Sequence, residues 1–169
     1  MLKKKKLYFT YRGRVSLSIL LKSAGVKKDD SVAVQSFTCS AVIEAIISLK
    51  ANPIFIDINK KDLIIDNNDL FRKLKNKKKV KAIIVQYTFG IHRNINKISN
   101  FCKKNNIFLI EDCCHVNPIV SIKNGMGSYG DASFFSFEWG KPIVGGIGGA
   151  FLLNNHKVLI KSNEIYKKL

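Results

Sequence analysis

The sequence contains few of the features that mark membrane-spanning or secreted proteins. Its 169 residues include 3 prolines and 1 tryptophan, and no apolar run approaches the roughly 18 residues that a membrane helix needs. The basic start MLKKKK is not followed by the apolar core of a signal peptide. We therefore expect a protein that is not secreted and has no membrane partner.

Cysteines are also few. The 4 cysteines are Cys39, Cys102, Cys113 and Cys114. Their spacing does not match a metal-ligand pattern, so we expect no metal site. Adjacent cysteines such as Cys113 and Cys114 make a poor disulfide pair, which favours reduced thiols and a cytoplasmic protein.

Acidic residues and arginines are scarce as well. The chain has 29 Lys and Arg against 12 Asp and Glu, a net charge of +17, yet only 4 of the basic residues are arginines. The lysines cluster near both termini and over 73–81, without interleaved aromatics or a known nucleic-acid module. We therefore interpret them as a solvated surface. A basic DNA- or RNA-binding domain is a minor alternative, which predicts steeply salt-dependent binding.

Strand-like and helical patterns alternate along the chain. Short apolar runs predict strands over Ser31–Gln35, Pro53–Ile58, Lys81–Gln86, Ile107–Glu111, Ala132–Phe137 and Gly149–Leu153. Periodic segments predict helices over Gly13–Gly25, Ser40–Lys50 (apolar nearly all round, hence buried), Asn67–Lys75, Asn94–Asn105 and Lys157–Leu169. This order is typical of a three-layer α/β/α fold with a mainly parallel sheet. We expect a basic arm over 1–12 and one domain over 13–169.

Two segments contain candidate site residues. Lys141 lies in the segment SFEWGKPIVGGIGG, and burial there would lower the pKa of its amine and make it a nucleophile. Asp112 lies in the segment EDCCH, at the end of a predicted buried strand. In open parallel sheets the ligand crevice lies at the carboxyl ends of the strands, so Thr38, Tyr87, Asp112 and Ser136 should converge there.

Each residue also has a simpler structural explanation. Lys141 could reach water from a strand end, Asp112 could cap a helix, and His115 could be a hydrogen-bonded loop residue. Ser136 could be structural, and the glycines could serve turns alone. The combination of a carboxylate and a lysine at two strand exits favours a cofactor site.

Six motifs occur in a fixed order along residues 13–154. They are Gly13-Arg14-Val15, Gln35-Ser36-Phe37-Thr38-Cys39, Pro53–Asp57, Tyr87-Thr88-Phe89-Gly90, Glu111-Asp112-Cys113-Cys114-His115 and Ser136–Gly149. This series resembles the DegT/DnrJ/StrS sugar aminotransferases, which are pyridoxal-phosphate enzymes of the aspartate aminotransferase fold. The resemblance implies that the chain is the cofactor-binding large domain, without the small C-terminal domain.

The resemblance also implies roles for single residues. Lys141 would form the Schiff base with pyridoxal 5′-phosphate and move protons, and Asp112 would pair with the pyridine nitrogen. His115 would hydrogen-bond the ring hydroxyl, and Ser136 would hold the phosphate. The remaining implied cofactor contacts are Gly13, Arg14, Val15 and Cys39, with the main-chain amides of Arg14 and Val15 on the phosphate.

Two positions depart from the family pattern. Arg14 replaces a frequent threonine and could contact the phosphate directly. Cys39 replaces the aromatic residue that usually stacks on the ring, and Phe37 or Trp139 could cover the ring instead.

The resemblance implies that an amino group moves from an amino acid, with glutamate as the favoured donor, to a nucleotide-linked keto sugar. Such sugars are used in surface polysaccharide or related sugar biosynthesis. The resemblance further implies a homodimer. Because the chain is short, two alternatives stay open. The chain could be a truncated, non-catalytic remnant, or one half of a split enzyme that keeps the cofactor-binding fold.

Overall fold

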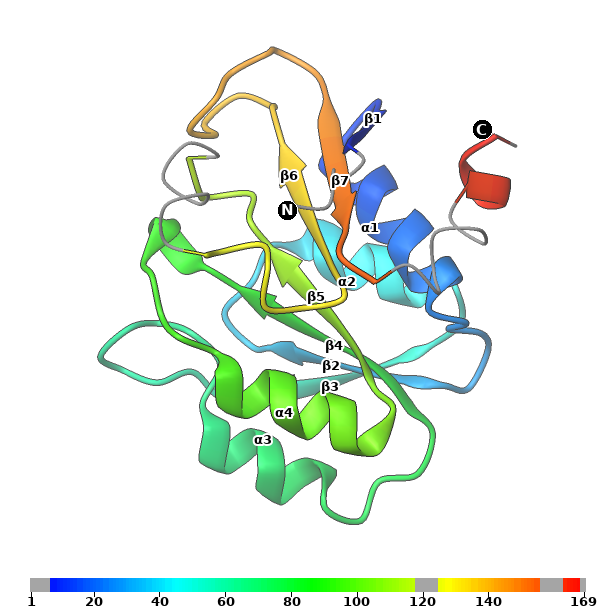
Figure 1. The fold of residues 1–169 in the computed structure, drawn as a ribbon, viewed down its shortest axis with the longest axis vertical. Helices are drawn as coiled ribbons and strands as arrows, with labels where there is room; N and C mark the ends of the chain where they lie inside the picture. The colour runs from blue at the N-terminus through cyan, green and yellow to red at the C-terminus, as the bar shows by residue number, and fades with distance from the viewer. Residues whose placement is uncertain (1–6, 118–124, 156–162, 168–169) are drawn as a thin grey trace, which may run out of the picture.

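The computed structural model describes residues 7–117, 125–155 and 163–167, which form three layers (Figure 1). The strands are β1 (Leu7–Thr10), β2 (Ser31–Gln35), β3 (Asn52–Ile56), β4 (Val80–Gln86), β5 (Phe108–Asp112), β6 (Ala132–Ser136) and β7 (Gly149–Leu153). The helices are α1 (Gly13–Ser23), α2 (Ser40–Ile47), α3 (Asn67–Leu74) and α4 (Asn96–Asn105), with a 3-10 turn η1 (Thr88–Gly90). Among these described residues, no helix is long and apolar enough to cross a membrane.

The strands form one 7-stranded sheet in the order β1-β7-β6-β5-β4-β2-β3. The strands β2 to β6 pair in parallel with one another, whereas β7 pairs antiparallel with both β6 and β1. The predicted mainly parallel α/β sheet is therefore confirmed. All five parallel strands end at the same edge, so residues that follow them meet there.

Each face of the sheet carries its own core. On one face, α1 and α2 pack over residues such as Val34 and Ile84. On the other face, α3 and α4 cover residues such as Ala33 and Ile83. Successive strand residues point to opposite faces, and here both faces are buried, which explains why the strands are continuous apolar runs.

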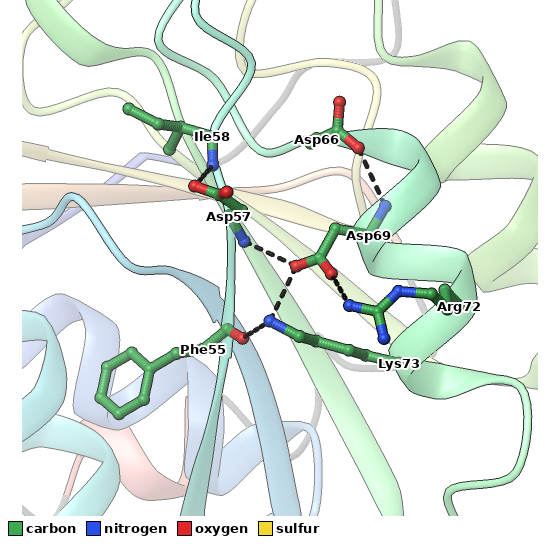
Figure 2. A network of polar contacts seen from close by, with 7 residues as sticks. All are labelled: Phe55, Asp57, Ile58, Asp66, Asp69, Arg72 and Lys73. Atoms are coloured by element: carbon green, nitrogen blue, oxygen red, sulfur yellow. Dashed lines mark hydrogen bonds and ion pairs between the residues drawn. The ribbon is translucent and has the colours of Figure 1, made fainter.

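A polar network attaches α3 to the end of β3 (Figure 2). Asp69, in the first turn of α3, accepts a hydrogen bond from the Asp57 N–H at 2.8 Å and an ion pair from Lys73 at 2.8 Å. Lys73 also donates to the carbonyl of Phe55 at 2.8 Å. The side chain of Asp66 caps the helix by accepting from the Asp69 N–H.

Three segments differ from the sequence predictions. Residues 7–10, part of the predicted arm, form β1 because Tyr8 is buried and stacks on Phe151 at 4.8 Å. The helix α2 ends at Ile47, which is 57% exposed, so this helix is buried on one side only. Of the predicted helix Lys157–Leu169, residues 163–166 are helical, and 157–162 and 168–169 lie outside the described residues.

Candidate functional site

A cavity of about 540 Å³ lies at the carboxyl ends of the parallel strands. Its lining residues come from the start of α1, the start of α2, the ends of β4 to β6 and the segment after β6. Six of the eight residues predicted for the site line this cavity: Arg14, Cys39, Asp112, His115, Ser136 and Lys141. Of the four residues expected to converge here, Asp112 and Ser136 line the cavity. Thr38 does not line it but donates a hydrogen bond to the lining residue Gln86, and the Tyr87 hydroxyl donates to Glu111 instead.

Asp112 ends β5 and contributes a buried carboxylate to the cavity wall, with only 3% of its surface exposed. Burial raises its pKa, against the opposing effects of a hydrogen bond from the Cys114 N–H at 2.9 Å and of the nearby Lys141 and His115. A cation placed in the cavity beside this carboxylate would stabilise its charged form.

The neighbouring carboxylate, Glu111, has a structural role on the opposite face of the sheet. It accepts hydrogen bonds from the Tyr87 hydroxyl at 2.6 Å and from the N–H groups of Gly127 and Gly130, both at 2.7 Å. Burial raises the pKa of Glu111, and these bonds oppose that shift. The alternation of side chains along β5 separates the two adjacent carboxylates into different roles.

His115 is fixed by the loop that follows β4. The Phe89 N–H donates to Nδ1 of His115 at 3.3 Å, and the two rings stack with centroids 6.0 Å apart. A Cβ on Gly90 would lie 2.7 Å from the His115 carbonyl oxygen, so only glycine fits there. Burial lowers the pKa of His115, which favours a neutral ring with its proton on Nε2. The ring can therefore donate one hydrogen bond to a ligand.

Lys141 is partly buried and lies beyond the end of β6. Its N–H donates to the Glu138 carbonyl at 3.2 Å, which closes a turn and fixes the lysine backbone. The side chain lines the same cavity as Asp112 and acts electrostatically on both Asp112 and His115. An amine, a carboxylate and a neutral imidazole thus lie in one cavity.

The start of α1 is packed tightly against the ends of β6 and β7. A Cβ on Gly13 would lie 2.9 Å from Cβ of Ser136, and a Cβ on Gly149 would lie 2.5 Å from the Gly13 nitrogen. The glycines at these positions let the helix N-terminus approach the cavity. Gly13 therefore has a packing role, although it does not line the cavity itself.

The amides at the start of α1 differ in their hydrogen bonding. The N–H groups of Val15 and Ser16 donate to the Arg12 carbonyl at 3.0 and 3.2 Å, whereas the Arg14 N–H has no acceptor among the described residues. The Val15 side chain lines a different, shallow surface pocket beside Glu44. Of the two predicted amides, that of Arg14 is the one free to bind an anion.

Aromatic cover for the cavity comes from Trp139. Cys39 lies at the mouth as the N-cap residue of α2, and Trp139 also lines the cavity with 80% of its surface exposed. Phe37 lies outside the cavity lining and makes an edge contact with Phe89, with ring centroids 6.4 Å apart. Of Phe37 and Trp139, Trp139 is the one that lines the cavity.

Three further polar residues line the cavity that the sequence reasoning did not select. Gln86 ends β4 beside Asp112 in the strand register and accepts from the Thr38 hydroxyl at 2.6 Å. Gln86 is a polar residue at the carboxyl end of an apolar strand, and this pattern could have indicated a cavity-lining residue from the sequence. Arg12 and Glu138 face each other across the cavity margin, and only the tertiary structure brings them together.

The sequence profile of the DegT/DnrJ/EryC1/StrS aminotransferase family matches residues 4–166. The chain belongs to this family. It is 32% identical to the GDP-perosamine synthase of Vibrio cholerae over 88% of this chain and 40% of that protein. It is 36% identical to the UDP-4-amino-4,6-dideoxy-N-acetyl-beta-L-altrosamine transaminase of Campylobacter jejuni over 83% of this chain and 39% of that protein. The chain spans about two fifths of the length of these relatives.

Solved structures agree on the fold. An aminotransferase from Psychrobacter cryohalolentis aligns with a TM-score of 0.83 at 23% identity, over 92% of this chain and 39% of that one. The protein ntda from Bacillus subtilis, solved with bound cofactor PMP, aligns with a TM-score of 0.81 at 23% identity, over 94% of this chain and 35% of that one. The aminotransferase fold and the family predicted from the motifs are confirmed.

Proposed function

We propose that this chain is the cofactor-binding part of a pyridoxal-phosphate-dependent aminotransferase. Its reaction moves an amino group from an amino acid, with glutamate as the favoured donor, to a nucleotide-linked keto sugar in polysaccharide or related sugar biosynthesis. The observation that carries the proposal is the presence of Lys141, Asp112 and His115 in one cavity. Family membership supports it, as do relatives that are named for GDP-linked and UDP-linked amino sugars.

The residues present fit this cofactor. Burial disfavours the charged form of Asp112, so this carboxylate needs a cationic partner, and a protonated ring nitrogen would supply one. A neutral imidazole with a free N–H suits the ring hydroxyl. The free Arg14 amide and the Ser136 hydroxyl suit the phosphate. Trp139 is placed to cover a planar ring.

Bound pyridoxal phosphate supplies an aldehyde that accepts amino groups and a protonated ring that withdraws electrons from the bond being broken. Lys141 would hold this aldehyde through Nζ, and its amine is the group that would carry a proton to and from the substrate carbon. Asp112 would keep the ring nitrogen protonated through its negative charge. His115 would orient the ring by donating a hydrogen bond from Nε2–H.

The same proposal extends to assembly and compartment. The resemblance to this family implies a homodimer. Exposed apolar residues beside the cavity support a second copy at this surface: Trp139, Ile143, Val144 and Ile147. All four cysteines are free thiols, which supports a reducing compartment such as the cytoplasm.

The test is covalent trapping of the cofactor. Purified protein is mixed with pyridoxal phosphate, its visible absorption spectrum is recorded, and the adduct is reduced with borohydride and mapped by peptide mass. We expect an absorption band at a longer wavelength than that of the free cofactor, and a label on Lys141. The Lys141→Ala variant should lose the label and slow the half-reaction with glutamate by about 10²–10⁴-fold.

Lys27→Ala is the matched control, because Lys27 is an exposed lysine that precedes β2, at the amino ends of the parallel strands and away from the cavity. It should be labelled at Lys141 like the unchanged protein. A folded protein that takes no label at Lys141 would contradict the proposal. Labelling without any half-reaction would favour the alternative of a remnant or of one half of a split enzyme.

A further inference from the structure

A carboxylate of this chain lies among the groups that suit an anion. Glu138 lines the cavity, and the Ser136 hydroxyl donates to its Oε2 at 3.4 Å. The Arg12 Nε lies 3.6 Å from its Oε1. Both contacts are long for a charged acceptor, because O–H···O⁻ distances are usually about 2.5–2.7 Å and N⁺–H···O⁻ distances about 2.7–2.9 Å. Glu138 is therefore held loosely, and its side chain is 31% exposed.

Arg12 lacks a good acceptor. Its Nε is shielded from solvent and has no hydrogen-bond partner among the described residues. The guanidinium also lies over the ring of Tyr11, 5.6 Å from its centroid, and an aromatic ring supplies no oxygen acceptor. A planar guanidinium can bind two oxygens of a phosphate at once, so a phosphate satisfies it better than Glu138 does.

The backbone brings Arg12 to the same corner as the other anion-binding groups. Arg12 is the N-cap residue of α1, and the free Arg14 N–H follows two residues later. Gly13, between them, packs directly against Ser136. The positive end of the helix, a hydroxyl and a guanidinium therefore meet at one place.

We propose that Arg12 binds the phosphate of the cofactor, and that Glu138 is the counter-ion which the phosphate displaces toward solvent. The proposal rests on the function proposed above and adds a binding residue and a competing residue to that site. Glu138 lowers phosphate affinity by like-charge repulsion and by occupying Ser136 and Arg12. Its backbone is fixed by a bridge to Gly146, so only the side chain has to move.

The test compares pyridoxal phosphate with pyridoxal, which lacks the phosphate. Trp139 is the single tryptophan and lines the cavity, so its fluorescence reports binding without any need for activity. Glu138→Gln should tighten pyridoxal phosphate by about 5- to 10-fold, and Arg12→Gln should weaken it by about 10-fold. Arg12→Lys, which keeps the charge but loses the fork, should fall between. Affinity for pyridoxal should change in none of them.

The matched control is Asp29→Asn, which also removes one negative charge. Asp29 precedes β2 and lies at the amino ends of the parallel strands, away from the cavity, and its φ of 67° suits asparagine. It should leave both affinities unchanged. Near-ultraviolet circular dichroism checks that each variant is folded.

Four results would overturn the inference. Equal tightening of pyridoxal by Glu138→Gln would place Glu138 against the ring. GDP is titrated in the same way as a third probe, and tightening of GDP alone by Glu138→Gln would assign Arg12 to a nucleotide diphosphate. Unchanged phosphate affinity in both variants, with Lys141 still labelled, would overturn this inference and leave the proposed function intact. Absence of binding by every form would overturn both.

Discussion

At the residue scale, the carboxylate of Asp69 joins three partners, the Asp57 N–H, Arg72 and Lys73 (Figure 2). Burial raises its pKa, but hydrogen bonds from the Asp57 N–H, Lys73 and Arg72 together outweigh burial and lower the pKa from 3.8 to about 2. The charged form of Asp69 therefore stabilises the folded state, because it joins α3 to the end of β3.

We predict that this stabilisation depends on pH in one direction. A depressed carboxylate pKa stabilises the fold at pH values above about 4 and loses that effect as pH falls from about 4 to about 2. Asp69→Asn removes the charge that pairs with Lys73 and Arg72, so it should lower the free energy of unfolding at pH 7. The loss should be only about 1–2 kcal/mol, because solvent screens these partly exposed partners. Denaturant titrations from pH 7 to pH 2 measure this. Equal pH slopes for Asp69→Asn and the unchanged protein would contradict it.

At the element scale, the position of α1 depends on glycines in strand β7 and at the helix start. A Cβ on Gly149 would lie 2.5 Å from both the Gly13 nitrogen and the Arg12 carbonyl carbon. These are backbone atoms, so the helix as a whole has to shift before a larger residue fits. The anion-binding start of α1 is therefore held in place by the absence of a side chain on β7.

We predict that Gly149→Ala damages stability and cofactor binding together. Overpacking should cost about 1–3 kcal/mol in the free energy of unfolding, and the displaced helix should bind pyridoxal phosphate more weakly. Gly145→Ala is the matched control in the same segment, since its nearest neighbour would be a side-chain atom of Phe137 at 3.3 Å. Thermal melts and the Trp139 titration measure both effects. A Gly149→Ala variant as stable as Gly145→Ala would refute the packing role.

At the scale of the whole molecule, the exposed apolar residues are not evenly spread. Trp139, Ile143, Val144 and Ile147 are all exposed on the segment that follows β6 and borders the cavity. Patches of this kind mark interaction surfaces in folded proteins. They support the proposed homodimer and suggest that association covers the mouth of the site.

We predict that the chain sediments as a two-chain particle and that Ile143→Ser with Val144→Ser weakens this association by about 10-fold or more. These residues are 43% and 51% exposed, so their replacement should not disturb the core. Phe55→Ser is the matched control, because Phe55 is 46% exposed on β3 at the far edge of the sheet. Sedimentation at several concentrations measures the dissociation constant. A single-chain particle, or equal weakening by Phe55→Ser, would count against this surface.

The sequence by itself determined the layers, the main chemical groups and every described strand except β1. Strand runs, glycines and the order of motifs are local features, and parallel strands bring Asp112, Ser136 and Gln86 to one edge whatever the loops do. The position of Lys141 follows from the same logic, because it lies a short turn beyond β6.

Only the tertiary structure decided the remaining features of the site. The pairing of β1 with β7 joins segments more than a hundred residues apart, and the contact between Arg12 and Glu138 depends on that pairing. Hydrogen bonding at the start of α1 decided that Arg14, and not Val15, keeps a free amide. Such choices depend on which side chains and amides meet across the fold, and neither periodicity nor spacing along the chain contains that information.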